Sequence, residues 1–351
     1  MAVITIIGAG AMGSAFSVPC VDRGHEVRLV GTHLDGDLLT EMRGGRPHPR
    51  LGVVIPRSGL VIADDTELSA SVADADLVVL GVNSQGIEWA LEVLGRTLRQ
   101  PVPLLLLTKG LFADGERLAI LPDYVRRELS RSRHGDIPVM AIGGPSIARE
   151  LAEYRDTSIV LAGTDADLCR STADRIRGDH YHIQTSADTV GVEVAAAFKN
   201  LYAIAVGLCE GSSEIRAERN HGALGFNPAA SVFAQAIREI AYLAELLGGT
   251  AASVYGLAGV GDLYVTSRRG RNNRAGKLMA SGTSWAELRR STMRDDTIEG
   301  AELAIAIAPT IMHLIECGRI DHARIPLLQV VIDVVVHGKP PAIPWSRFLE
   351  Y

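Results

Sequence analysis

The sequence predicts an α/β domain built on a doubly wound parallel sheet, followed by a mainly α-helical domain. In the first half, short apolar runs rich in Val, Ile and Leu alternate with amphipathic segments, a pattern typical of parallel strands with helices on both faces. After about residue 186, long helical segments replace the strand-like runs. The length of 351 residues also suits two domains.

Each expected strand is a short apolar run bounded by Gly, Pro or Asp, as in strands buried on both faces. These runs are Val3–Ile7, Val27–Val30, Leu77–Val82, Leu104–Leu107, Val139–Ile142 and Ser158–Leu161. The helices expected between them are Met12–Arg23, Ile87–Leu98 and Glu116–Ser130. We expect this first domain to comprise residues 1–187.

The second domain is expected to comprise residues 188–351. Its long helices are predicted at Val192–Leu208, Ala229–Leu247, Gly300–Glu316 and Leu327–His337. The apolar stretch Leu327–Val336 suits either a core or an interface between protein copies.

The composition excludes several classes of function. The net charge is −6, so the chain lacks the basic surface that binds nucleic acid or anionic membranes nonspecifically. Its four cysteines are far apart without CxxC spacing, which indicates neither a metal site nor a disulfide framework. We find no signal peptide and no apolar run of the length of a membrane span, and we expect a cytoplasmic protein.

The opening residues VITIIGAGAMG place Gly8, Gly10 and Gly13 directly between a strand and a helix. In this context the glycines permit a tight turn, a close approach of the backbone to a pyrophosphate, and close helix–strand packing. The helix N-terminus also attracts phosphate. The sequence therefore predicts a Rossmann-type domain that binds a dinucleotide.

The end of the second strand bears on the choice between NAD and NADP. An acidic residue that binds the ribose is expected there, but the strand runs into Gly31, Thr32 and His33, and Asp35 follows late. Small and polar groups leave room for a 2′-phosphate, which favours NADP. Asp35 can still turn back toward a ribose, so NAD stays open.

A helix predicted at residues 191–208 is apolar around nearly its whole circumference, and Lys199 is one of its two charged residues. Such a helix is usually buried. Burial lowers the pKa of a lysine, which suits it to proton transfer near neutral pH. The alternatives are a lysine that reaches solvent or one that forms a structural ion pair.

A second candidate site lies in Gly259–Lys277, which reads GVGDLYVTSRRGRNNRAGK. Four arginines fall within seven residues of this otherwise acidic chain, and threonine and asparagine accompany them. Guanidinium groups match the geometry of phosphate. The cluster therefore indicates an anion site, although a solvated basic loop would show the same composition.

Taken in order along the chain, six segments resemble the NAD(P)-dependent glycerol-3-phosphate dehydrogenases. They are the loop Gly8–Gly13, HPRLG at His48–Gly52, TKG at Thr108–Gly110, GGPSIARE at Gly143–Glu150, FKN at Phe198–Asn200 and GVGDLYVTSRRGRN at Gly259–Asn272. The resemblance covers essentially the whole chain. The opening GAGAMGSAFSVP and the segment GGRPHPRLG are most similar to archaeal-type members.

The resemblance implies interconversion of dihydroxyacetone phosphate and sn-glycerol 3-phosphate by hydride transfer. Lys199 would be the general acid/base at the ketone oxygen, Lys109 would polarise that oxygen, and Asp262 would hold Lys199 in place. The implied substrate-binding residues are Asn200, Thr266, Arg271, Asn272, Pro145 and Ser146. The implied cofactor-binding residues are Gly8, Gly10, Ala11, Met12, Gly13, Thr32, His33, Lys109, Ala148, Arg271 and Glu299. A homodimer is also implied.

Two departures leave the substrate open. Ala229 and Gln235 stand where the family typically has basic residues, and the segment Cys209–Leu224 reads as a longer, more charged loop. A different phosphorylated keto-sugar or keto-polyol is therefore an alternative substrate. Less favoured alternatives are a ketopantoate or 3-hydroxyacid reductase and a non-catalytic dinucleotide-binding protein.

Overall fold

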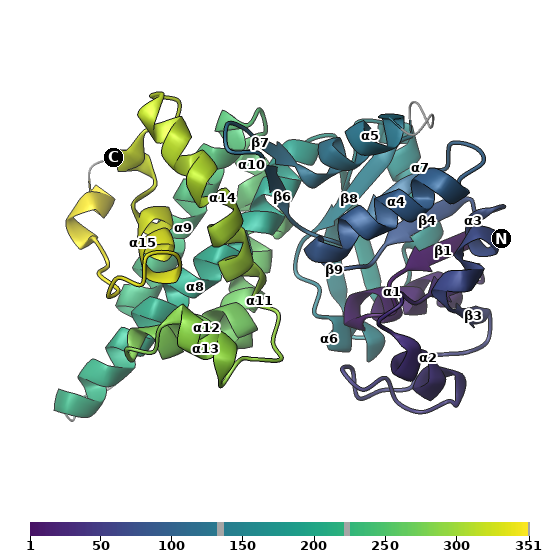
Figure 1. Cartoon of the computed structure of the whole chain (residues 1–351), viewed down its shortest axis with the longest axis horizontal. Helices are drawn as coiled ribbons and strands as arrows, with labels where there is room; N and C mark the ends of the chain where they lie inside the picture. The colour runs from purple at the N-terminus through teal and green to yellow at the C-terminus, as the bar shows by residue number, and fades with distance from the viewer. Residues whose placement is uncertain (132–136, 221–224, 350–351) are drawn as a thin grey trace. The chain divides into compact units, whose positions relative to one another are not determined.

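A computed structural model describes residues 1–131, 137–220 and 225–349. The chain forms two compact units (Figure 1). The first comprises Met1–Lys109 and Leu121–Val192, and the second comprises Gly110–Ile120 and Glu193–Tyr351. The first unit is α/β and the second is mainly helical, which confirms the predicted fold class.

One eight-stranded sheet runs through the first unit in the order β10-β9-β8-β5-β4-β1-β2-β3. Its strands are β1 (Val3–Ile7), β2 (Glu26–Val30), β3 (Leu60–Ala63), β4 (Leu77–Leu80), β5 (Leu104–Leu106), β8 (Val139–Gly143), β9 (Thr157–Ala162) and β10 (Tyr181–Ser186). All neighbours from β3 to β8 are parallel, whereas β9 runs antiparallel to β8 and parallel to β10. Neither β3 and β10 nor the reversed direction of β9 was predicted from the sequence.

Alternating side chains of the central strands enter two hydrophobic cores, one on each face of the sheet. On β4, Leu77 and Val79 belong to one core, whereas Val78 and Leu80 belong to the other. Helices α1 (Ala11–Asp22), α2 (Gly36–Arg43), α6 (Ala148–Ala152) and α7 (Ala166–Ile176) contribute to the first core. Helices α3 (Leu68–Val72), α4 (Ile87–Thr97) and α5 (Leu121–Arg131) contribute to the second. Burial on both faces explains why these strands read as continuous apolar runs.

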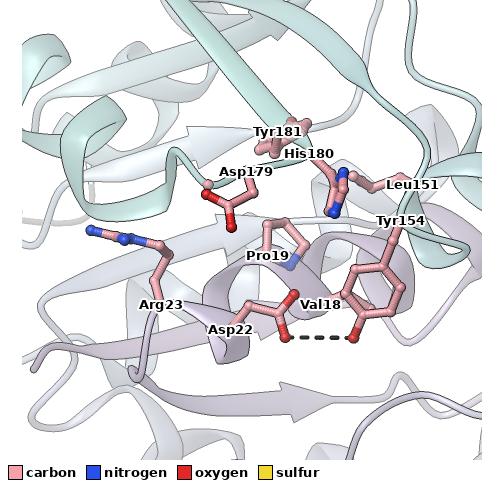
Figure 2. A pocket seen from close by; sticks show the side chains of 10 residues that line it. Val18, Pro19, Asp22, Arg23, Leu151, Tyr154, Asp179, His180 and Tyr181 are labelled. Atoms are coloured by element: carbon pink, nitrogen blue, oxygen red, sulfur yellow. Dashed lines mark hydrogen bonds between the residues drawn. The ribbon is translucent and has the colours of Figure 1, made fainter.

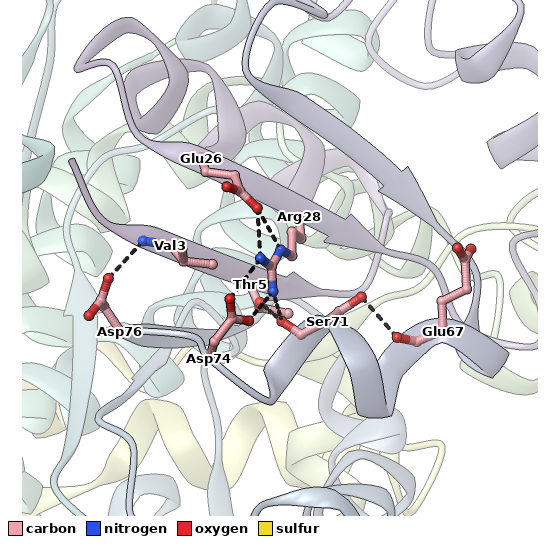
Figure 3. A network of polar contacts seen from close by, with 8 residues as sticks. All are labelled: Val3, Thr5, Glu26, Arg28, Glu67, Ser71, Asp74 and Asp76. Atoms are coloured by element: carbon pink, nitrogen blue, oxygen red, sulfur yellow. Dashed lines mark hydrogen bonds and ion pairs between the residues drawn. The ribbon is translucent and has the colours of Figure 1, made fainter.

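A polar network joins β1 and β2 to α3 (Figure 3). The guanidinium of Arg28 on β2 forms ion pairs with Glu26 and Asp74 and donates to the carbonyl of Ser71. The hydroxyl of Thr5, the β1 partner of Arg28, donates to the same carbonyl. Both carboxylates raise the pKa of Arg28, so the half-buried guanidinium stays charged.

A hairpin of two short antiparallel strands, β6 (Leu111–Ala113) and β7 (Leu118–Ile120), belongs to the second unit. Its Gly115 N–H donates to the hydroxyl of Thr310 at 2.9 Å. The helix predicted at Glu116–Ser130 is therefore wrong in its first residues, because β7 occupies Leu118–Ile120 and α5 begins at Leu121.

The helices of the second unit form the rest of its fold. They are α8 (Thr189–Asn220), α9 (Asn227–Leu246), α10 (Ala251–Tyr255), α11 (Asp262–Arg269), α12 (Arg271–Ala280), α13 (Trp285–Arg290), α14 (Glu299–Glu316) and α15 (Pro326–Val335). The loop expected over residues 209–224 is wrong up to residue 220, because α8 continues to Asn220. Residues 221–224 lie outside the described residues.

Glycines allow two helices to pack directly against the backbone of α8. A Cβ built on Gly276 of α12 would lie 2.2 Å from the carbonyl oxygen of Ile204, and one on Gly207 would lie 2.1 Å from that of Asn273. A Cβ on Gly300 of α14 would lie 2.3 Å from the carbonyl oxygen of Asn200. The close packing leaves almost the whole apolar part of α8 buried, as its composition predicts.

Within the described residues, the segment Thr189–Glu218 of α8 is long and apolar enough to cross a membrane, with a mean hydropathy of 1.5. The expectation that no segment reaches this length is therefore wrong. All of its apolar window is buried inside the protein, however, and the core helix of a globular domain passes the same test. The segment is weak support for a membrane span.

A buried carboxylate, Glu239 of α9, caps the N-terminus of α15. It accepts hydrogen bonds from the backbone N–H groups of Leu327 at 2.8 Å and Leu328 at 3.0 Å. The Tyr202 hydroxyl and the Gln235 amide donate to it at 2.9 and 3.0 Å. Gln235, one of the two departures from the family pattern, is thus committed to this buried cluster.

The stability of the protein should depend on pH through Glu239. Burial raises the pKa of its carboxyl from 4.5 to about 7, against the effect of the four donors. Because the folded state then binds the proton more tightly, the contribution of Glu239 to stability is complete below pH 4.5 and is lost as the pH rises to about 7. We expect Glu239→Gln to remove this dependence and, because an amide cannot accept from all four donors, to lower stability by about 1–3 kcal/mol.

Thermal unfolding at several pH values between 4.5 and 8 measures this effect. The matched control is Glu245→Gln, an exposed glutamate on the same helix. A difference in Tm between wild type and Glu239→Gln that is constant over the whole pH range would contradict the assignment.

Candidate functional site

The predicted nucleotide loop lies between β1 and α1, and its three glycines have three different surroundings. Gly8 has φ of +108°, and a Cβ on it would lie 2.7 Å from the backbone nitrogen of Val82. A Cβ on Gly13 would lie 2.0 Å from the carbonyl oxygen of Gly8. At Gly10 a Cβ would meet nothing within 4 Å. The loop is therefore closely packed on its inner side and open at Gly10, the glycine that lets a pyrophosphate approach the backbone.

His48 holds this loop through a hydrogen bond to its residue Ala9. This role was not predicted from the sequence. The ring is fully buried, and its Nδ1 accepts from the backbone N–H groups of Arg50 and Leu51 at 3.1 and 3.3 Å. Nε2 therefore carries the proton and donates to the carbonyl of Ala9 at 3.2 Å. Burial lowers the pKa of His48, which favours this neutral form. The signal was present in the HPRLG motif.

Several predicted ligands lie after parallel strands of the same sheet, as a dinucleotide site requires. Ala11 and Met12 begin α1, Thr32 and His33 follow β2, Lys109 follows β5, and Pro145, Ser146 and Ala148 follow β8. The Lys109 ammonium donates to the carbonyl of Gly144 at 3.4 Å, so the structure brings the TKG and GGPS segments together. The Ser146 hydroxyl is buried without a hydrogen-bond partner among the described residues, which leaves it available to a ligand.

At the end of β2, Asp35 turns back toward the strand. Its Oδ2 accepts from the backbone N–H of Thr32 at 2.8 Å and from the Thr32 hydroxyl at 2.9 Å. The exposed ring of His33 lies beside Trp89, with centroids 5.7 Å apart. One carboxylate oxygen of Asp35 is therefore occupied within the protein.

In the second unit, the predicted pair of Lys199 and Asp262 is present. Lys199 Nζ of α8 donates to Asp262 Oδ1 of α11, and both residues are buried, with exposed fractions of 8% and 1%. A buried ammonium needs such a partner, because transfer of an unpaired charge from water to the protein interior costs roughly several kcal/mol. The ion pair fixes the position of the Nζ atom on the mostly apolar part of α8.

A π-helical turn at Leu257–Gly261 leads directly into α11 and its first residue, Asp262. A Cβ on Gly259 in this turn would lie 2.1 Å from the carbonyl oxygen of Val254. Turns of this kind are rare and often occur at functional sites. Here the turn determines where the carboxylate of Asp262 enters the core.

Asn200, which follows Lys199 in the sequence, forms a second cluster with Asn272 and Glu299. The Asn200 amide donates to Glu299 Oε2 at 2.8 Å, and the Asn272 amide donates to Asn200 Oδ1 at 3.1 Å. The Asn272 carbonyl oxygen accepts from the Gly300 N–H at 2.9 Å. The structure thus joins three predicted site residues from α8, α12 and α14.

The side chains of Thr266 and Arg271 make no hydrogen bond, among the described residues, to the side chains of Lys199, Asp262, Asn200, Asn272 or Glu299. The Thr266 hydroxyl donates to the carbonyl of Asp262 one turn earlier at 2.7 Å. Arg271 begins α12 with an exposed side chain and, within the described ranges, has no hydrogen bond or ion pair. Burial raises the pKa of Glu302; Arg289 and, more weakly, Arg271 act against this rise. Arg271 is therefore a free cation next to the asparagine cluster.

Comparison with known proteins decides the family. Residues 3–169 match the NAD-dependent glycerol-3-phosphate dehydrogenase N-terminus, and residues 188–345 match the C-terminus of the same family. The chain belongs to the glycerol-3-phosphate dehydrogenase family. It is an NAD(P)-dependent oxidoreductase that acts on a CH–OH group.

The relatives cover 80% to 99% of this chain. The NADP(+)-dependent enzyme of Archaeoglobus fulgidus is 34% identical over 284 residues, covering 80% of this chain and 81% of the relative. The NAD(P)+ enzyme of Desulfitobacterium hafniense is 32% identical and covers 99% and 91% of the two chains. The crystal structure of the Coxiella burnetii enzyme superposes with a TM-score of 0.79 at 25% identity, covering 99% and 97%. The archaeal relative supports the archaeal-type resemblance.

Proposed function

We propose that Lys199 is the general acid/base of a glycerol-3-phosphate dehydrogenase that interconverts dihydroxyacetone phosphate and sn-glycerol 3-phosphate. The observation that carries this proposal is the buried ion pair of Lys199 with Asp262. Conversion of a ketone to an alcohol requires a proton at oxygen as negative charge develops there. Lys199 Nζ would give this proton, and Asp262 would keep the ammonium oriented and stabilise it.

The residues of the first unit suit the dinucleotide. When bound, the nicotinamide cofactor supplies or accepts the hydride. Gly10 leaves room for its pyrophosphate, and the N-terminus of α1 attracts the phosphate charge. Lys109 would polarise the ketone oxygen, and the unpartnered hydroxyl of Ser146 would bind substrate.

We propose NADP(H) as the preferred cofactor. The Archaeoglobus relative is NADP(+)-dependent. In this chain β2 is followed by uncharged Thr32 and exposed His33, while Thr32 occupies one oxygen of Asp35. We also propose that the protein is cytoplasmic and forms a homodimer.

Initial rates of dihydroxyacetone phosphate reduction, with NADH and NADPH in parallel, test the function and the cofactor together. We expect oxidation of both cofactors with a higher kcat/KM for NADPH. No turnover in protein that binds NADPH would overturn the proposed substrate and would direct the search to larger phosphorylated ketones. Gln235 gives little support to that alternative, since its amide is bonded to Glu239 in the helical core.

Arg271 is proposed as the phosphate anchor, so its loss should weaken substrate binding. A charge-assisted bond of guanidinium to phosphate contributes about 1.5–3 kcal/mol. We expect Arg271→Ala to raise KM for dihydroxyacetone phosphate about 10- to 100-fold with little change in kcat, because the bond persists from ground state to transition state. Arg274→Ala, an exposed arginine on the same helix that lies 3.7 Å from Asp296, is the matched control. A fall in kcat at constant KM would contradict phosphate anchoring.

A further inference from the structure

A cavity of about 410 Å³ lies in the first unit, between the end of α1, the end of α6 and the segment before β10 (Figure 2). Its apolar wall is formed by Val18, Pro19 and Leu151. Val18 and Pro19 are 8 and 9 residues beyond Gly10, which places the cavity about 12–14 Å along α1 from the nucleotide loop. The cavity is therefore separate from the proposed cofactor site, and none of the predicted site residues lines it.

The charges around the cavity favour a cation. Figure 2 shows the carboxylates of Asp22 and Asp179 near the apolar wall, whereas the guanidinium of Arg23 points away from them. In the described part of the chain neither carboxylate forms an ion pair, although the Tyr154 hydroxyl donates to Asp22 at 3.5 Å. Partial burial raises the pKa of the exposed Asp22, although the Tyr154 hydroxyl and the nearby His180 act in the opposite direction. A positive charge placed between the carboxylates would offset the effect of that burial.

Tyr154 lies at the rim of the cavity in a conformation that is unfavourable for its type. Its φ of 60° is the only positive φ of a non-glycine residue in the described ranges. The N–H of Tyr154 bonds to the carbonyl of Leu151, and that of Arg155 bonds to the carbonyl of Glu150. Tyr154 therefore follows Glu153, the C-cap of α6, at the position where glycine is favoured. A bulky residue there costs about 1 kcal/mol. The Tyr154 ring lines the cavity, and its centroid lies 6.2 Å from the centroid of the His180 ring.

We propose that this cavity binds a small organic amine, with its ammonium between Asp22 and Asp179 and its apolar body against Pro19 and the ring of Tyr154. The aromatic ring attracts a cation over its face, and 410 Å³ is within the range of small-molecule sites. The imidazole of His180 also lines the cavity, with its Nδ1 3.9 Å from Asp156, and it interacts electrostatically with Asp22.

Isothermal titration of the full-length protein with 2-phenylethylamine tests the proposal, with 2-phenylethanol and phenylacetate as neutral and anionic probes of the same shape. We expect saturable binding of the amine, weaker binding of the alcohol and none of the anion. Asp179→Asn should weaken amine binding about two- to fivefold, the size expected for one partly exposed charge pair. Asp333→Asn in the second unit is the control and should leave it unchanged.

Tyr154→Gly separates a binding role from a structural one. Glycine relieves the positive φ, so the Tm should be maintained or raised while affinity for the amine falls. Each titration is repeated with saturating NADPH, which should not displace the amine. No saturable binding of the amine, tighter binding of phenylacetate, displacement by NADPH, or equal affinity in wild type, Asp179→Asn and Tyr154→Gly would each overturn the proposal.

Discussion

Lys199→Ala is expected to lower kcat for dihydroxyacetone phosphate reduction by about 10²–10⁴-fold, the usual contribution of a positioned general acid. Dinucleotide affinity should change little, because the glycine loop and the segments after β2, β5 and β8 belong to the first unit. Initial rates with saturating substrate measure kcat, and fluorescence titration with NADPH measures the affinity.

Lys199→Ala also has a structural effect that must be separated from catalysis. It leaves the buried carboxylate of Asp262 without the ammonium, and removal of one partner of a buried pair costs about 3–5 kcal/mol. The double variant Lys199→Met with Asp262→Asn removes both charges and should recover much of the lost Tm. If the double variant also recovers turnover, Lys199 is structural; we expect turnover to stay low.

Asp262→Asn alone should give an intermediate result. The neutral amide still holds the Lys199 side chain by a hydrogen bond but no longer stabilises its charge. We therefore expect a smaller fall in kcat than for Lys199→Ala, and a shift of the basic limb of the pH–rate profile toward lower pH, because the loss of a nearby negative charge disfavours the ammonium. An unchanged pH profile would show that Asp262 does not act on the proton donor.

Much of the fold was accessible from the sequence because its main signals are local. The apolar runs of β1 and β4, the glycine spacing and the apolar circumference of α8 all reflect burial that neighbouring residues determine. β6 and β7, of three residues each, are not fully buried and escaped detection, whereas the equally short β5 was detectable as a fully buried run of leucines. The reversed direction of β9 depends on pairing with β8, a contact that no short segment encodes.

In the candidate site, too, the features set by neighbouring residues could be predicted, whereas those set by distant contacts could not. Lys199 was identifiable as a charge on an apolar helix, and Arg271 as part of a basic cluster, since both contrast with their neighbours in the chain. The bonds of Asn200 to Glu299 and of His48 to Ala9 join residues 99 and 39 positions apart. Gln235 was interpreted as a missing charge near the substrate, but its partner Glu239 places it in a buried polar cluster.

The glycine loop allows a test that separates folding from cofactor binding. At Gly13, a Cβ would lie 2.0 Å from the carbonyl oxygen of Gly8. Because this oxygen belongs to the backbone, the clash can be relieved only if the loop or α1 moves. Gly13→Ala should therefore displace α1 from β1 and lower both Tm and NADPH affinity. At Gly10 nothing lies within 4 Å, so Gly10→Ala should fold with a Tm close to that of wild type.

Gly10→Ala should nevertheless lose much of its affinity for NADPH, because its methyl group enters the space through which the pyrophosphate approaches the backbone. We expect Kd to rise about 10- to 100-fold, the equivalent of about 1.4–2.8 kcal/mol. Gly36→Ala is the matched control: this first residue of α2 also has nothing within 4 Å of its Cβ position, and it is not among the predicted ligands. Normal NADPH affinity in Gly10→Ala would mean that the pyrophosphate does not pass over this residue, since the chain offers no other steric reason for a glycine there.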